Sequence, residues 1–139
     1  MIEQEILEII ASDSDDVGRR LNDVADQFRS GRDPKDLLAL LDSDNDELVS
    51  WGAWFLKEIP FAIYESDAFL TRLRALTDHR VPLVRILALQ ALFPSLSAED
   101  GTTQALIRKL LSDPDDAVRS LAGISAARLS LVSKDGPYQ

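Results

Sequence analysis

The chain has 139 residues, of which 45% are apolar and 28% are charged, and it contains no cysteine. This length and composition predict a single globular domain with a real core, and they exclude a disulfide framework and a thiolate metal site. The formal net charge of −9, with no segregated basic face, argues against nucleic-acid binding, because such a protein must neutralise phosphates with Lys and Arg.

The amino-terminal stretch MIEQEILEII carries three glutamates and no basic residue, whereas a secretory signal begins with positive charge. No apolar run in the sequence approaches the roughly 20 residues that a membrane-spanning helix needs. We therefore expect a cytoplasmic protein that has no membrane partner.

Four pairs of helices are predicted along the chain. The first helices of the pairs cover about residues 2–12, 34–42, 67–77 and 102–112. The second helices cover about residues 15–29, 46–59, 82–93 and 115–131.

Proline and aspartate mark where these helices begin. Pro34 and Pro82 stand at helix starts, where the missing N–H of proline costs nothing. Asp13, Asp44 and Asp113 stand where N-caps are expected, because a carboxylate there accepts hydrogen bonds from unpaired backbone N–H groups.

Residues 59–64 are the only short strand candidate, and the proline at position 60 weakens that assignment. Three aromatic residues lie in this link and at the start of the next helix. We expect Phe61, Tyr64 and Phe69 to fill the core between units.

A motif recurs at the second helices: an acidic turn leads to a valine that opens a new apolar run. Val49, Val84 and Val118 mark three copies, 35 and 34 residues apart, and Val17 marks a weaker copy 32 residues upstream. Nearly constant spacing predicts a repeat architecture in which stacked hairpins share a continuous core. The units cover about residues 2–30, 34–59, 67–94 and 102–131 of a single domain at 1–139, with a flexible tail at 132–139.

The two strongest copies, LTDHRVPLVRILALQAL and LLSDPDDAVRSLAGISAARL, resemble the HEAT repeat. In both, the acidic turn leads to Val-Arg, as Val84-Arg85 and Val118-Arg119, and then to alanines at helical spacing. The copy before these departs from the pattern, because Ser50 stands in place of the arginine.

The resemblance implies an all-α fold, a short right-handed α-solenoid of about four helical hairpins. The usual work of that family is binding other proteins. Some HEAT-like proteins are chromophore-lyase subunits and others are DNA glycosylases, so the fold alone does not choose a function.

The two tryptophans raise the question of a binding surface. Trp51 and Trp54 lie two and five residues after Val49, on the side of the helix that points away from the valine. The next second helix is also apolar at these positions, and a helix that is apolar all round is either buried or presents an apolar patch. In a HEAT-like stack the second helices line the concave side, which predicts a groove for a partner; the alternative is that the tryptophans pack into the core. The predicted floor of the groove comprises Trp51, Trp54, Ile86, Leu89 and Phe93.

Acidic residues gather in the turns inside the hairpins. Stacking would place these turns side by side as an acidic ridge, which serves helix capping or steers a basic partner. The stretch DSDNDE is not a calcium-binding EF-hand loop, because Glu47 and Ala53 stand where that loop needs glycine and glutamate. The ridge residues predicted to contact a partner are Asp42, Asp44, Asp46, Asp113, Asp115 and Asp116.

Catalysis has few candidate residues. His79 is the only histidine, and we expect it to be solvated in a turn between Asp78 and Arg80. There is no cysteine nucleophile, no glycine-rich phosphate loop and no HExxH motif. We expect no enzymatic activity, no cofactor and no bound metal.

The sequence therefore predicts a protein-binding scaffold or adaptor. A narrower prediction is an inhibitor or immunity protein, because a small acidic domain suits the neutralisation of a basic toxin such as a nuclease. The alternative is an accessory subunit of an enzyme, as in the chromophore-lyase-like HEAT proteins.

Overall fold

The computed structural model describes residues 1–12 and 14–131. The predicted N-cap at Asp13 and the predicted tail at 132–139 lie outside the described residues. Within them the fold is all-α and contains no β-strand, which confirms the predicted fold class at that level. The helices are α1 (Ile2–Ala11), α2 (Val17–Arg29), α3 (Asp36–Leu41), α4 (Asp46–Glu58), α5 (Phe61–Tyr64), α6 (Asp67–Leu76), α7 (Pro82–Leu92), the 3₁₀-helix η1 (Phe93–Ser95), α8 (Gly101–Leu111) and α9 (Asp116–Arg128).

Each predicted helix has a counterpart, and the sequence missed two short elements. Residues 59–64, considered as a strand, instead contain the helical turn α5. Pro60 has a φ of −58°, and its carbonyl accepts a hydrogen bond from the N–H of Ile63 at 3.0 Å. Proline thus starts a helical turn here, since its fixed φ suits a helix start and it has no N–H for a sheet. Of the three aromatic residues expected in the core, Tyr64 and Phe69 are buried and Phe61 is half-buried.

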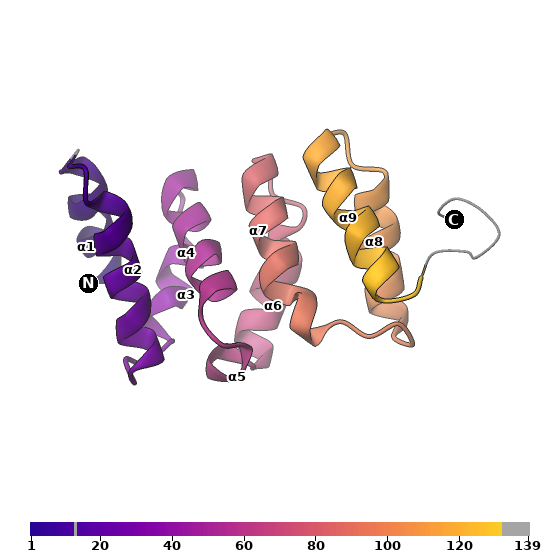
Figure 1. Cartoon of the computed structure of the whole chain (residues 1–139), viewed down its shortest axis with the longest axis horizontal. Helices are drawn as coiled ribbons and strands as arrows, with labels where there is room; N and C mark the ends of the chain where they lie inside the picture. The colour runs from indigo at the N-terminus through magenta and orange to yellow at the C-terminus, as the bar shows by residue number, and fades with distance from the viewer. Residues whose placement is uncertain (13, 132–139) are drawn as a thin grey trace.

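The helices follow one another in chain order along the long axis of the molecule (Figure 1). α2, α4, α7 and α9 lie toward the viewer, and α1, α3, α6 and α8 lie behind them. Each front helix contacts the rear helix that precedes it, as α4 contacts α3 and α9 contacts α8. Along the front row α7 contacts both α4 and α9, so the middle and last pairs are joined through their second helices.

Side-chain caps fix where three of the helices begin, although not always at the predicted residue. Asn45, rather than Asp44, caps α4 by accepting from the backbone N–H of Glu47 at 2.9 Å. Asp115, rather than Asp113, caps α9 by accepting from the N–H of Val118 at 3.0 Å. Asp100 caps α8 in the same way. The acidic turns offer several capping side chains, and the backbone selects the one directly before the first helical residue.

The end of α2 depends on a glycine. Gly31 has a φ of +119°, which side chains with a Cβ rarely adopt. Just beyond it, the N–H of Arg32 donates to the carbonyl of Gln27 at 2.9 Å, which satisfies an acceptor of the last helical turn. The chain then reverses into the second pair.

The apolar core extends from the first pair to the last. One buried cluster includes residues of α1 through α7, and a second joins Leu89 of α7 to α8 and α9. Fully burying each large apolar side chain contributes about 1.5–3 kcal/mol. The core holds the front helices in a fixed row, and this row carries the candidate surface.

Candidate functional site

The two tryptophans lie on α4, half-buried and in contact with each other. Their rings meet edge to face with centroids 5.4 Å apart, and the ring of Trp54 meets that of Phe55 at 5.3 Å in a similar geometry. Both tryptophans pack against the larger core cluster. Each such aromatic pair contributes about 0.5–1.5 kcal/mol beyond the burial of area. The tryptophans therefore serve the core and also reach the surface.

The other predicted groove residues differ in exposure. Ile86 on α7 and Phe93 at the start of η1 are half-buried, whereas Leu89 is only 1% exposed and belongs to the second core cluster. Leu89 and Phe93 line one surface hollow together, but the two tryptophans and Ile86 are not among its lining residues. The predicted groove floor is thus divided, and Leu89 forms a buried base rather than an exposed contact.

This hollow, which we call the α4/α7/α9 hollow, has a volume of about 380 Å³. Among its lining residues is Ile124 of α9, a large apolar side chain that is 50% exposed. A cleft of this size falls within the range of roughly 300–1,000 Å³ that is typical of binding pockets. The lining residues are Lys57, Leu89, Gln90, Phe93, Pro94, Leu121, Ile124, Ser125 and Arg128.

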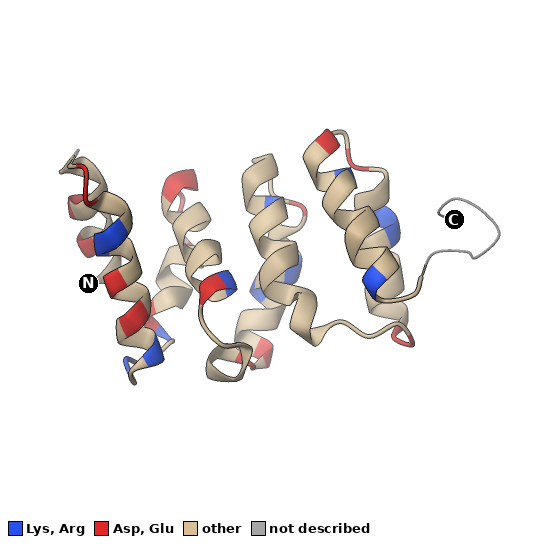
Figure 2. Cartoon of the chain, viewed as in Figure 1, with Lys and Arg blue, Asp and Glu red and all other residues tan. Residues whose placement is uncertain are grey.

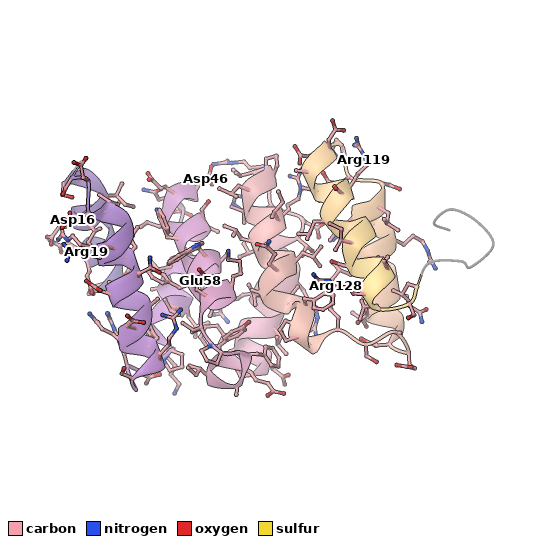
Figure 3. The ribbon with its side chains drawn as sticks, in the orientation of Figure 1. Asp16, Arg19, Asp46, Glu58, Arg119 and Arg128 are labelled. Atoms are coloured by element: carbon pink, nitrogen blue, oxygen red, sulfur yellow. The ribbon has the colours of Figure 1, made fainter. Side chains whose placement is uncertain are left out.

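Two basic side chains edge the hollow from different helices. Lys57 comes from α4, with its Nζ 3.8 Å from a carboxylate oxygen of the adjacent Glu58. Arg128 comes from α9, and its guanidinium carbon lies 5.9 Å from the centroid of the Phe93 ring, within cation–π range. Figure 3 labels Glu58 and Arg128, both on the front helices. The lining contains no carboxylate, although acidic residues outnumber basic ones 24 to 15 in the chain.

Sequence reasoning missed the contribution of α9. Leu121, Ile124, Ser125 and Arg128 follow the spacing i, i+3, i+4, i+7, so they share one helical face. Ser125 is buried and Leu121 packs against the second core cluster, whereas Ile124 and Arg128 are exposed. This stripe contains a large apolar residue, Ile124, and an arginine, Arg128. The two together were the sequence signal that this face reaches the surface.

The acidic turns are largely occupied by intramolecular contacts. Figure 2 shows acidic residues at several helix ends with basic residues among them. Asp115 caps α9, and Asp44 is exposed, with no ion pair among the described residues. The ion pairs of the other exposed or half-buried ridge residues are Asp42–Arg72 at 2.8 Å, Asp46–Arg80 at 2.6 Å and Asp116–Arg119. Such pairs are worth about 0–1 kcal/mol each, but they neutralise charge that a basic partner would need.

Asp113 is not available to a partner, in contrast to the prediction. Its side chain is only 7% exposed and accepts two hydrogen bonds from Arg85, both at 2.9 Å. It also accepts from the backbone N–H of Asp115 at 2.9 Å. Burial alone would raise the pKa of Asp113, but these hydrogen bonds and the charges of Arg85 and Arg119 hold the pKa below its ordinary value.

The arginines of the two Val-Arg motifs make the same local bond. The Nη1 of Arg85 donates to the carbonyl of His79 at 2.7 Å, and the Nη1 of Arg119 donates to the carbonyl of Asp113 at 2.6 Å. In each case the arginine reaches back six residues to the turn before its helix. Ser50 holds the equivalent position in α4, and its hydroxyl donates to the carbonyl of Asp46 instead.

Ion pairs also link neighbouring helical pairs throughout the described part of the chain. The partners are 27 to 34 residues apart, close to the repeat spacing. These contacts are Glu5–Arg32, Asp42–Arg72, Asp46–Arg80, Asp78–Lys109 and Arg85–Asp113. Four of these five carboxylates, all but Glu5 of α1, lie in or beside the acidic turns, so the turns help to set the register between units.

His79 is not solvated as we expected. Its Nδ1 accepts a hydrogen bond from the backbone N–H of Val81 at 3.1 Å, and its Nε2 lies 3.5 Å from a carboxylate oxygen of Asp46. Only 18% of the side chain is exposed. Both ring nitrogens thus have structural partners in the turn.

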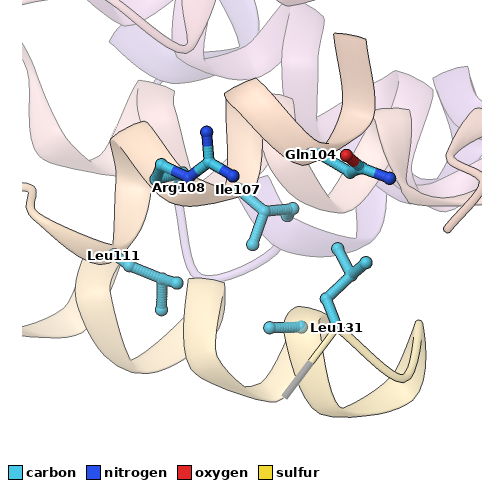
Figure 4. A pocket seen from close by; sticks show the side chains of 6 residues that line it. Gln104, Ile107, Arg108, Leu111 and Leu131 are labelled. Carbon is cyan, nitrogen blue, oxygen red and sulfur yellow. The ribbon is translucent and has the colours of Figure 1, made fainter. Parts of the chain in front are cut away.

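A second hollow of about 210 Å³ lies on the last helical pair. Figure 4 shows Ile107 of α8 between Leu111 and Leu131, with Arg108 and Gln104 above them in the view. Leu131, the last residue that the structure describes, is one of its lining residues. It is smaller than the α4/α7/α9 hollow, whose lining comes from α4, α7, η1 and α9.

Neither a membrane span nor a metal centre is present in what the structure describes. No helix among residues 1–12 and 14–131 is long and apolar enough to cross a bilayer. The same residues contain no group of three or more His, Cys, Asp or Glu side chains placed to hold a metal ion. Comparison of the chain with models of protein families, with curated proteins and with solved structures found no match.

Proposed function

We propose that the four helical pairs form a short α-solenoid of HEAT-like hairpins. Three observations support this: the order of the pairs along the molecule, the spacing of 34 and 35 residues between the repeat valines, and the arginine-to-carbonyl bond that recurs in α7 and α9. A stack of this kind buries one side of each second helix and leaves the other side in a continuous row.

We infer that the protein binds another protein through this row and acts as a scaffold or adaptor rather than as an enzyme. The observation that carries the proposal is the α4/α7/α9 hollow, where Ile124 is half-exposed above a base formed by Leu89. Trp54 and Lys57 are three residues apart and hence neighbours on the surface of α4, so the tryptophan pair extends the surface from the hollow. Tryptophan and arginine are among the residues that are enriched at protein-binding hot spots.

The narrower prediction of an inhibitor or immunity protein draws its support from the net charge of −9. The ion pairs of Asp42, Asp46 and Asp116 weaken that support, because these carboxylates already have basic partners. The accessory-subunit alternative stays a prediction, which the copurification of a pigment or small molecule would favour.

An affinity experiment with matched variants tests the binding proposal. The full chain is immobilised and exposed to an extract of the cells that produce it, alongside Ile124→Asp and the control Leu7→Asp. Leu7 is 41% exposed on α1, in the rear row, so both variants place the same charge on a half-exposed apolar site.

We expect a protein that is retained by the wild type and by Leu7→Asp and is lost with Ile124→Asp. Circular dichroism and urea unfolding would establish that both variants are folded. Equal retention by all three chains would overturn the proposal that this face is the binding surface.

A further inference from the structure

We propose that the α4/α7/α9 hollow binds a segment of a partner protein that is both apolar and acidic. An apolar side chain of the segment enters the hollow, and a carboxylate of the segment lies beside Lys57 or Arg128. The inference rests on the proposed protein-binding function and adds the chemical class of the segment that is recognised.

The hollow presents apolar side chains to a partner. Leu89, Phe93 and Leu121 form the walls and base, and Ile124 stands half-exposed at the edge. An apolar side chain that covers Ile124 would remove further apolar surface from water, at about 25 cal/mol per Å². A short helix or extended segment presents such a side chain readily, and grooves between helices are a common docking site for it.

Two basic side chains flank the hollow. Lys57 and Arg128 approach the hollow from α4 and α9, on opposite sides of α7. The 11 ion pairs among the described residues include Lys57 only through its neighbour Glu58 at 3.8 Å, and they do not include Arg128.

This arrangement differs from that of the acidic turns, where several arginines and a lysine form ion pairs with carboxylates, most of them in the neighbouring unit. The chain has a net charge of −9, but the lining of the hollow is positively charged, because it has two basic residues and no carboxylate. Charge complementarity therefore favours a partner segment with Asp or Glu and disfavours a basic one.

The arginine is held in a position to serve this role. Its guanidinium lies over the ring of Phe93, which restrains the side chain without neutralising its charge. An arginine held in this way can donate two parallel hydrogen bonds to a carboxylate. A segment whose apolar side chain contacts Ile124 has its next turn within reach of Arg128, because the two α9 residues are four apart and share a face.

The test uses a displayed library of random 12-residue peptides, selected on the full chain. Recovered sequences are synthesised with a fluorescent label, and their dissociation constants are measured by anisotropy. The variants are Lys57→Glu/Arg128→Glu and Ile124→Asp. The control is Arg74→Glu/Arg108→Glu, which changes the net charge by the same amount at exposed sites on α6 and α8.

We expect the selection to enrich peptides that combine large apolar residues with Asp or Glu. Their binding should weaken at least tenfold with Lys57→Glu/Arg128→Glu and with Ile124→Asp, and change less than twofold with the control pair. A urea titration of each variant establishes that it is folded.

The other outcomes separate the two proposals. Peptides that lose affinity with Ile124→Asp but tolerate the charge reversal, or that are basic, would overturn the acidic-segment inference and leave the binding surface in place. Peptides that tolerate all variants would overturn both. A dimer detected by light scattering and dissociated by Arg128→Glu would assign the hollow to a second copy of this chain and overturn the inference, as would failure to enrich any acidic peptide.

Discussion

Arg85 and Asp113 form the most enclosed ion pair among the described residues, with side chains 11% and 7% exposed and two hydrogen bonds of 2.9 Å between them. The arginine belongs to α7 and the aspartate to the turn before α9, so the pair fastens the last helical pair to the one before it. The backbone carbonyl of Asp113 also accepts from Arg119. One turn thus satisfies two arginines that occupy the same position in successive units.

Removing the charge of Asp113 should therefore weaken the fold. We expect Asp113→Asn to lower the free energy of unfolding at pH 7 by about 3 kcal/mol, because Arg85 would remain as a buried cation without its counter-ion. Urea unfolding followed by circular dichroism measures the loss. The control Asp78→Asn breaks the exposed pair with Lys109 and should cost less than about 1 kcal/mol. Losses of equal size would contradict the distinction between a buried and an exposed pair.

The same pair predicts an acid-sensitive part of the stability. The pKa of Asp113 is lower in the folded chain than its ordinary value of 3.8, so its contribution is present above that value. The contribution disappears as the pH falls through the lower folded pKa. The difference in unfolding free energy between the wild type and Asp113→Asn should hence be constant from about pH 5 to 7 and shrink below about pH 4. A difference that is independent of pH down to pH 2 would argue against an ionised Asp113.

Tyr64 predicts a loss of stability at alkaline pH. Its hydroxyl donates to the carbonyl of Ala91 at 2.7 Å, and burial raises its pKa to about 12. Because the folded pKa is above the ordinary value of 10.0, the contribution is complete below pH 10 and is lost as the pH rises toward 12. We expect Tyr64→Phe to be about 1 kcal/mol less stable at pH 8 and to show a smaller decline from pH 10 to 11.5 than the wild type. Parallel declines would indicate that Tyr64 does not titrate in the course of unfolding.

Local features of the fold followed from the sequence because they depend on neighbours in the chain. The alternation of apolar stripes and turns predicted the paired helices. Pro82 does begin α7, whereas Pro34 lies two residues before the start of α3. The caps were right in residue type but displaced, as Asn45 and Asp115 replaced Asp44 and Asp113. Several residues in each acidic turn are suitable N-caps by type, so residue type alone does not predict which of them caps the helix.

Contacts between units did not follow from the sequence. The partners of Asp42, Asp46 and Asp113 lie 28 to 34 residues away, and nothing local in the acidic turns identifies them. The helical wheel left open whether Trp51 and Trp54 face a groove or pack into the core, and both are half-buried against the larger core cluster. It did not predict that Leu89 would be covered by α8 and α9, since that depends on how closely the last pair approaches.

The packing of α3 on α4 leads to a prediction about two glycines. A Cβ at Gly52 would lie 2.8 Å from the Cβ of Leu40, which is too close for the helices to accommodate without moving apart. Gly52→Ala should therefore destabilise the chain by about 1–3 kcal/mol, although alanine favours helix by about 1 kcal/mol. The control is Gly18→Ala in α2, where the added methyl group meets nothing within 4 Å and should raise stability by about 0.5–1 kcal/mol. Thermal and urea unfolding of both variants would test the opposite signs.

The ring contacts of the two tryptophans predict which of them contributes more to the stability of the fold. This difference decides which tryptophan variant is suitable for testing the binding surface. Trp54 lies between Trp51 and Phe55 and contacts both rings, whereas the only aromatic neighbour of Trp51 among the described residues is Trp54. We expect Trp54→Ala to lower the free energy of unfolding by about 3 kcal/mol and Trp51→Ala by roughly half as much. Urea unfolding followed by the fluorescence of the remaining tryptophan measures both. The reverse order would mean that Trp51 is the main core contact. If the predicted order holds, Trp51→Ala removes an aromatic ring from the proposed surface and keeps the fold. A loss of partner binding in that variant is then attributable to the surface itself.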